Sequence, residues 1–281
     1  MRTILIIANL TLREAIRRKI VLAALILGTA FLLLYGLGFH FIRQEMLRAD
    51  YGRLPSTTMQ NQTFNFMLLA GMYVVNFLCI AIAALITADS LAGEIQSGII
   101  QATVTKPIRR SEVVLGKWLG NATLLLFYLS LMGGGVMLVV WLISRLYAPN
   151  WAGGLALIYF NSLLIMTLTL ACSSSLSTLA TGGVVFGAFG LAFLGGWVER
   201  IGTFLENRTA IDLGIFSSLL MPSEALWNKA AALMTSPLAS LMGITPFTSA
   251  SEPSALMIVY AVIYLLVTLG IAIRVFTKRD L

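Results

Sequence analysis

Residues 66–88 read FMLLAGMYVVNFLCIAIAALITA and contain no charged side chain. A helix that crosses a bilayer needs about 20 mostly apolar residues, because its backbone polar groups must find their hydrogen bonds within the helix. This stretch meets that condition, and so do several others along the chain. The predicted membrane spans are 20–41, 66–88, 118–142, 154–176, 180–198 and 255–276.

The composition of the whole chain agrees with this interpretation. Of its 281 residues, 58% are hydrophobic and only 11% are charged, whereas soluble domains carry roughly 25% charged residues. We therefore predict an all-α integral membrane protein with a single transmembrane domain over 1–281. Cys79 and Cys172 both lie in apolar stretches, so neither a disulfide framework nor a CxxC metal site is predicted.

The basic residues lie at the ends of the apolar runs, which argues against a nucleic-acid-binding face. If both termini are on one side, that side holds 12 of the 19 Lys and Arg residues and only five of the 12 acidic residues. The whole formal charge of +7 then lies there. Because positive loops remain in the cytoplasm, we predict a multi-pass protein of the cytoplasmic membrane with both termini inside.

Besides the inner segment 89–117, two segments are neither spans nor simple loops. Residues 1–19 have Ile4, Leu5, Ala8, Leu12, Ala15 and Ile16 on one face of a helix and Arg2, Asn9, Arg13 and Arg17 on another. This pattern predicts a helix on the inner membrane surface, in contact with lipid headgroups, that bends into the first span at residues 17–19. A plain cytoplasmic extension of the first span is the alternative.

The second such segment is 199–254, between the fifth and sixth spans, which is expected outside the cell. Its apolar runs are interrupted by Pro222 and Pro237. Short amphipathic or re-entrant helices fit it best. The alternative is a seventh and an eighth span, which would leave Asp212, Glu224 and Lys229 near lipid.

The inner segment 89–117 reads DSLAGEIQSGIIQATVTKPIRRSEVVLGK. The second span is predicted to continue as a polar-faced helix from Asp89 to Gln101, and Lys106-Pro107 ends it, since proline has no N–H and restricts the residue before it. Ser111 is predicted to be the N-cap of the next helix, with Glu112 in its first turn. These signals favour a short helix and turn held rigidly between two spans, as a lever. The alternative is a basic loop that only sets the orientation of the chain in the membrane.

The residues of several common active sites are missing. The pair Gly116-Lys117 is followed by Trp118 and lacks the upstream glycine, so no phosphate-binding loop of the G-x-x-x-x-G-K-[ST] type is formed. His40 is the single histidine, which excludes a histidine-rich metal site and a zinc protease. The spans offer no central Asp or Glu for coupling to an ion gradient, although Asn76 and Asn161 remain as candidate sodium ligands.

Glycine is frequent in the fifth span. Gly183 and Gly187 are four residues apart, a spacing that lets helix backbones approach closely in lipid. The pair fits either a contact within the chain or a dimer interface.

Taken together, these residues resemble the type-2, exporter-type ABC permease family. The resemblance is carried by Gly93-Glu94, Gly98, Lys106-Pro107, Arg109 or Arg110, Ser111 and Gly116-Lys117, and by the basic ending Phe276-Thr277-Lys278-Arg279-Asp280-Leu281. It extends over essentially the whole chain. The importer-type pattern, Glu-Ala-Ala followed by a distant glycine, is missing from the predicted cytoplasmic loops, because Glu224-Ala225-Leu226 is expected outside.

The resemblance implies a noncatalytic permease subunit that forms a homodimer or pairs with a similar permease. It binds no cofactor itself, and ATP and Mg²⁺ would belong to a separate ABC ATP-binding subunit. The residues implied to dock that ATPase are Glu94, Gly98, Lys106, Pro107, Arg109 and Arg110, while Ser111, Gly116 and Lys117 would form the start of the third span. Its dimer interface, flanked by spans one and five, favours the dimer role of Gly183 and Gly187.

The expected function is export driven by ATP hydrolysis on the partner. Two other classes of function remain open from the sequence. An ion-coupled secondary transporter would work as the purified chain alone, and a noncatalytic assembly subunit would bind a membrane complex without an ATPase.

Overall fold

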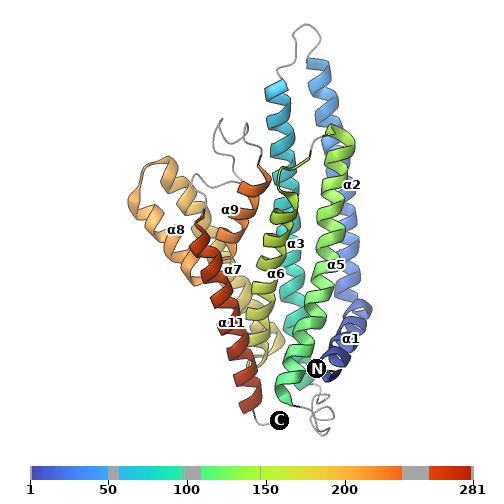
Figure 1. Ribbon diagram of the computed structural model, residues 1–281, viewed down its shortest axis with the longest axis vertical. Helices are drawn as coiled ribbons and strands as arrows, with labels where there is room; N and C mark the ends of the chain where they lie inside the picture. Colours follow the sequence, from blue (N-terminus) through green and yellow to red (C-terminus); the bar gives the residue numbers. More distant parts are fainter. Residues whose placement is uncertain are drawn as a thin grey trace.

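The computed structural model describes residues 2–49, 57–96, 98, 109–145, 147–235 and 253–279. The described ranges are helical and contain no strand (Figure 1). The helices are α1 (Arg2–Arg17), α2 (Lys19–Ala49), α3 (Thr57–Gln96), α5 (Arg110–Ser144), α6 (Trp151–Ser173), α7 (Thr178–Phe204), α8 (Arg208–Leu220), α9 (Ser223–Met234) and α11 (Ala255–Lys278). Both ends of the chain lie at the same end of the molecule.

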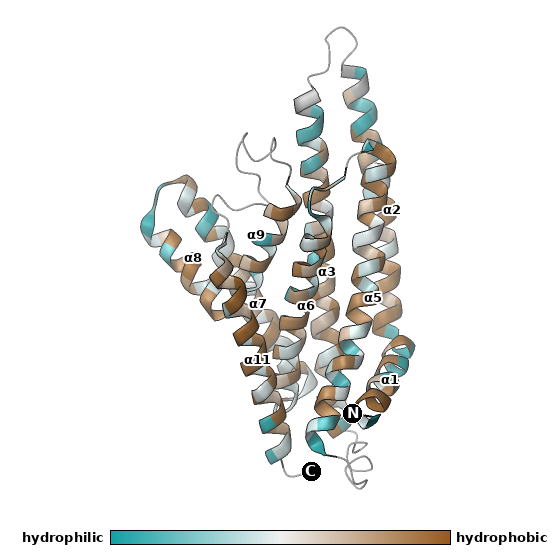
Figure 2. Cartoon of the chain, viewed as in Figure 1, coloured by the Kyte–Doolittle hydropathy of each residue, from teal (hydrophilic) through white to brown (hydrophobic). Residues whose placement is uncertain are grey.

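Within the described ranges, six helices are long and apolar enough to cross a membrane: α2, α3, α5, α6, α7 and α11. Each predicted span overlaps one of them, which confirms the predicted fold class. The fourth predicted range is displaced by about three residues, because α6 begins at Trp151 and ends at Ser173. Figure 2 shows apolar middles on these helices, with polar residues near several helix ends.

The central element is α3, which packs against α2, α5, α6, α7 and α9. Its most apolar stretch is 67% buried within the chain, compared with 11% for α2. Leu69, Met72 and Val75 are completely buried in this core. The face of α2 that points away from α3 and α5 carries exposed leucine and isoleucine side chains, so lipid or another protein must cover it in the membrane.

The N-terminal helix bends into α2 at Arg18, as predicted. On the predicted apolar face, Ala15 is buried against the rest of the chain, while Leu5 and Ile16 are 65% and 61% exposed, as side chains that face lipid would be. Helix α1 packs against two glycines of α5. Its location on the membrane surface stays a prediction.

Both predicted helix boundaries in 89–117 were displaced. Helix α3 ends at Gln96, and Gly98 has φ +74° with its N–H bonded to the carbonyl of Ile95 at 3.3 Å. A left-handed backbone favours glycine and stops the helix earlier than the predicted Gln101. The N-cap of α5 is Arg109, not Ser111, because the Glu112 carboxylate accepts the Arg109 backbone N–H at 3.4 Å.

The first part of segment 199–254 contains the end of α7 and the helices α8 and α9. In Figure 1, α8 folds back along α7, and α9 then runs in the opposite direction against α6. With 13 and 12 residues, both are too short to be the alternative seventh and eighth spans. Residues 221–228, where the chain turns from α8 into α9, are buried, which fits the predicted re-entrant arrangement. Residues 236–252 lie outside the described ranges.

Candidate functional site

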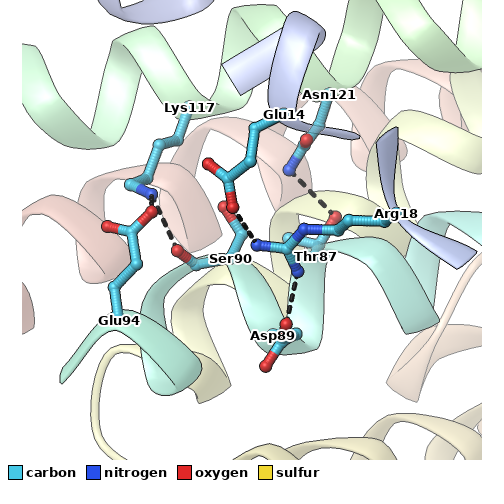
Figure 3. A network of polar contacts seen from close by, with 8 residues as sticks. All are labelled: Glu14, Arg18, Thr87, Asp89, Ser90, Glu94, Lys117 and Asn121. Carbon is cyan, nitrogen blue, oxygen red and sulfur yellow. Dashed lines mark hydrogen bonds and ion pairs between the residues drawn. The ribbon is translucent and has the colours of Figure 1, made fainter. Parts of the chain in front are cut away.

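A buried ion pair joins the last turn of α3 to the first turns of α5 (Figure 3). The ammonium of Lys117 binds the Glu94 carboxylate and also donates to the backbone carbonyl of Ser90 at 2.7 Å. The two charged side chains are only 6% and 16% exposed. Since a buried charge is costly without a partner, these contacts hold the last turns of α3 against the start of α5.

Arg18 extends this network to the bend between α1 and α2. Its guanidinium binds Asp89 of α3 and, at 2.5 Å, Glu14 of α1. Burial by itself lowers the pKa of Arg18, but the hydrogen bond to Glu14 and the charges of Glu14, Asp89 and Glu94 outweigh it and raise the pKa. Arg18 therefore remains charged and ties α1 and α2 to α3.

A third contact joins α3 and α5 one helical turn closer to the middle of both helices. The side-chain amide of Asn121 donates to the hydroxyl of Thr87 at 3.4 Å. Asn121 is one turn beyond Lys117 on α5, and Thr87 is one turn before Ser90 on α3. The two helices are thus joined by polar contacts on consecutive turns.

Two glycines of α5 form the surface on which α1 lies. A Cβ on Gly116 would lie 2.6 Å from the Cβ of Ile7, and one on Gly120 would lie 2.7 Å from the carbonyl oxygen of Ala8. Any side chain larger than hydrogen would therefore displace α1. The spacing Gly116-x-x-x-Gly120 is the small-residue pattern that allows close helix contacts in membranes.

The start of α5 also contacts the C-terminal end of the chain. The guanidinium of Arg110 donates to the carbonyls of Thr277 and Arg279 at 3.1 and 2.6 Å. Arg279 in turn donates to the carbonyl of Ser174, after α6, at 2.6 Å. Polar contacts at this end therefore connect α1, α2, α3, α5, α11 and the end of α6.

The structure brings together two of the predicted site residues, Glu94 and Lys117. Gly98 and Arg109 lie at the two borders of a segment of which 99–108 is outside the described ranges. Lys106 and Pro107 belong to that part. Arg109 is exposed and forms no ion pair with any described residue.

The remaining predicted residues are distributed over two helices. Ser111 lies in the first turn of α5, and Gly116 contacts α1. Gly183 and Gly187 on α7 are at open positions, because a Cβ at either would meet nothing within 4 Å. They therefore make no close contact with the described part of this chain.

Sequence reasoning missed a second buried ion pair at the other side of the core. Arg200 of α7 binds the carboxylate of Glu224 on α9 and donates to the Asn228 side-chain oxygen at 3.0 Å. The side chains of Arg200 and Glu224 are 7% and 5% exposed. The Arg200 guanidinium also lies 5.5 Å from the centre of the Trp197 ring. The sequence pattern does not reveal that α9 is buried, so the pairing of Arg200 with Glu224 could not be predicted from it.

These features define a multi-pass helical membrane protein whose helices are joined by ion pairs near the end that carries the termini. The family described as ABC-2 family transporter protein matches residues 5–281. The chain therefore belongs to the ABC-2 transporter family and is a membrane permease subunit of an ABC transporter, which confirms the resemblance seen in the sequence. A search of curated proteins found no match for the chain.

Proposed function

We propose that this chain is the membrane subunit of an ATP-driven exporter, and that a separate ATPase subunit docks on the segment 89–117. The observation that carries the proposal is the ion pair between Glu94 and Lys117. It joins the two helices that border this segment, α3 and α5, directly at its base. A displacement of the segment by a docked ATPase would then move both helices together.

The neighbouring contacts describe how such a displacement would spread. Arg18 links α3 to the bend between α1 and α2, and Arg110 links α5 to the end of α11. Gly116 holds α1 directly on α5. Closure of the ATPase subunits would therefore reach most of the spans through short polar contacts, with ATP and Mg²⁺ bound only by the partner.

The two arginines at the start of α5 have different roles in this proposal. Arg110 is used within the chain, since its guanidinium binds backbone carbonyls near the end of α11. Arg109 is exposed, and its guanidinium forms no ion pair with any described residue. We assign Arg109 to an acidic surface of the ATPase, together with Gly98, Lys106 and Pro107 as the turn that fits against it.

The orientation follows from the charge distribution. Lys and Arg are concentrated on the side of the termini, and short loops with excess positive charge stay in the cytoplasm. A reporter that is active only in the cytoplasm should be active when it is fused to the C-terminus. An extracytoplasmic reporter signal would place 89–117 out of reach of ATP and contradict the proposal.

Docking is tested by co-purification of the ATPase with the tagged permease. Arg109→Glu should reduce recovery of the ATPase at least tenfold, because it places a like charge against an acidic surface. Arg43→Glu makes the same charge change on the exposed surface at the opposite end of α2, so it should leave recovery unchanged. Equal recovery with both variants would contradict the role of Arg109. Gradient-driven transport by the chain alone, or a stable complex without an ATPase, would contradict the function.

A second permease copy, or a similar chain, completes the proposed transporter. The open glycines Gly183 and Gly187 on α7 and the exposed face of α2 are available for it. In a chain in which Cys79 and Cys172 have been replaced, Gly183→Cys should form a disulfide between two copies in membranes. Cysteine at the exposed Leu256 of α11 is the control and should remain monomeric.

A further inference from the structure

An apolar cavity of about 380 Å³ lies at the end of α5 that is opposite the termini. Its volume is within the range of about 300–1,000 Å³ that small-molecule pockets occupy. The lining residues come from α3, α5, α6 and the connection before α6, and three of them are the aromatic residues Trp141, Tyr147 and Trp151. Tyr147 and Trp151 are 72% and 51% exposed, so the cavity opens to the side of the molecule.

The location of the cavity matches a membrane surface. Helix α5 ends at Ser144, whereas α2 and α3 continue beyond it and become polar (Figures 1 and 2). Tryptophan and tyrosine are enriched at this depth, where apolar rings meet the lipid headgroups. The opening therefore faces the boundary between acyl chains and headgroups.

A positive charge lies beside the cavity. The guanidinium of Arg145 is 5.0 Å from the centre of the Trp141 ring, which forms part of the wall. Arg145 is exposed and makes no ion pair with any described residue. An apolar cavity with an unpaired cation beside it is complementary to a molecule with an apolar chain and an anionic group.

The backbone of Arg145 gives an independent reason to assign a role to its side chain. It is the C-cap of α5 in the left-handed conformation, with φ 59° and ψ 16°. Glycine is the usual residue at such helix ends, because other side chains are strained there. Strained residues of this kind occur preferentially at binding and catalytic sites.

From these observations we propose that the cavity is a binding site for an anionic phospholipid of the surrounding bilayer. One acyl chain lies between Trp141 and Trp151, and the headgroup phosphate is paired with Arg145. The site concerns the membrane surface opposite the termini, so it does not depend on the ATPase partner or on the direction of transport.

The test uses the full chain in nanodiscs of phosphatidylcholine that contain a small fraction of lipid with brominated acyl chains, which quench nearby tryptophans. The contribution of the site is obtained by subtracting the signal of the double variant Trp141→Phe/Trp151→Phe. Brominated phosphatidylglycerol should quench this contribution about fivefold more effectively than brominated phosphatidylcholine, because one interfacial cation contributes about that factor.

Three variants separate lipid binding from a structural role. Arg145→Gln and Arg145→Gly should both lose the preference for phosphatidylglycerol, and Arg145→Gly should unfold at the same or a higher temperature because the strain is removed. Arg208→Gln changes the same charge at an exposed residue of α8 and should keep the preference.

Several results would overturn the proposal. Equal quenching by the two lipids would show that no anionic headgroup is selected, and no quenching by either would show that protein covers the cavity. If both Arg145 variants keep the preference for phosphatidylglycerol, Arg145 is not part of the site. A lower unfolding temperature of Arg145→Gly in phosphatidylcholine would show that the side chain serves the helix end instead.

Discussion

The ion pairs around Arg18 and Lys117 and the Arg200–Glu224 pair differ in the solvent exposure of their side chains. At the end that carries the termini, Arg18 and Asp89 are 20% and 42% exposed, and Lys117 and Glu94 are 6% and 16% exposed. On the other side of the core, Arg200 and Glu224 are 7% and 5% exposed. Exposed pairs are weakened by water and salt, whereas an isolated charge in a buried pair is strongly destabilising.

This difference fits a division of roles along the molecule. The Arg200–Glu224 pair fixes α9 against α7, and its loss should damage the fold. The network around Arg18 is graded, from the buried Lys117 to the half-exposed Asp89. A half-exposed ion pair such as Arg18–Asp89 can break at low cost, because water can solvate both charges. Such a pair suits a region that is proposed to move when an ATPase closes.

The largest effect is expected from Arg200→Met. It leaves the carboxylate of Glu224 buried without its cation, which should lower the free energy of unfolding by about 3–5 kcal/mol. Thermal unfolding in detergent micelles or nanodiscs measures the loss. The double variant Arg200→Met/Glu224→Met removes both charges and should recover most of the stability. A double variant as unstable as the single one would show that the ion pair is not the cause.

Gly120→Ala should have the next largest effect. The added methyl would lie 2.7 Å from the Ala8 carbonyl oxygen, so α1 must move away from α5. Such overpacking costs about 1–3 kcal/mol. Faster trypsin cleavage after Arg13 and Arg17 would report the release of α1.

The control for this prediction is on the same helix. A Cβ at Gly134 would meet nothing within 4 Å. Gly134→Ala should therefore be neutral, or stabilising by up to about 1 kcal/mol through helix propensity. Equal cleavage rates in the two alanine variants would mean that Gly120 does not hold α1 in place.

The sequence was sufficient to predict features that depend on neighbouring residues. The length of an apolar run determines whether a helix can span the bilayer, so all six predicted spans correspond to helices. The bend at Arg18 is also predicted from neighbouring residues, because the three consecutive basic residues 17–19 separate one apolar pattern from the next.

Features that depend on contacts between helices were not predicted. Glu94 and Lys117 were both assigned to one segment, but their pairing follows from the way α3 and α5 pack together. Glu224 is predicted on the outer side, and only the fold of α8 and α9 brings it to Arg200. The contact spacing of Gly116 and Gly120 was present in the sequence but could not indicate which helix would lie on it.

Lys117→Met tests the Glu94–Lys117 pair, which is more exposed than the Arg200–Glu224 pair and less exposed than the Arg18–Asp89 pair. Glu94 would lose its cation but keep partial access to water, so we expect a loss of about 2 kcal/mol, less than for Arg200→Met. The ATPase activity of the complex should no longer respond to the permease, since α3 and α5 would not move together. The matched variant Lys117→Arg should retain both properties in large part. Unchanged coupling in Lys117→Met would contradict the role of the Glu94–Lys117 pair.

The smallest effect is expected from Asp89→Asn, which removes one of the two exposed partners of Arg18. Arg18 keeps its contact with Glu14, and the pair with Asp89 is open to solvent, so the loss should be below about 1 kcal/mol. The loss should also shrink further in about 1 M salt, where charges are screened over roughly 3 Å. Unfolding of Arg200→Met should show no comparable salt dependence, because its unpaired carboxylate is shielded from ions by the protein. If both variants respond equally to salt, the two networks do not differ in exposure to water as the structure indicates.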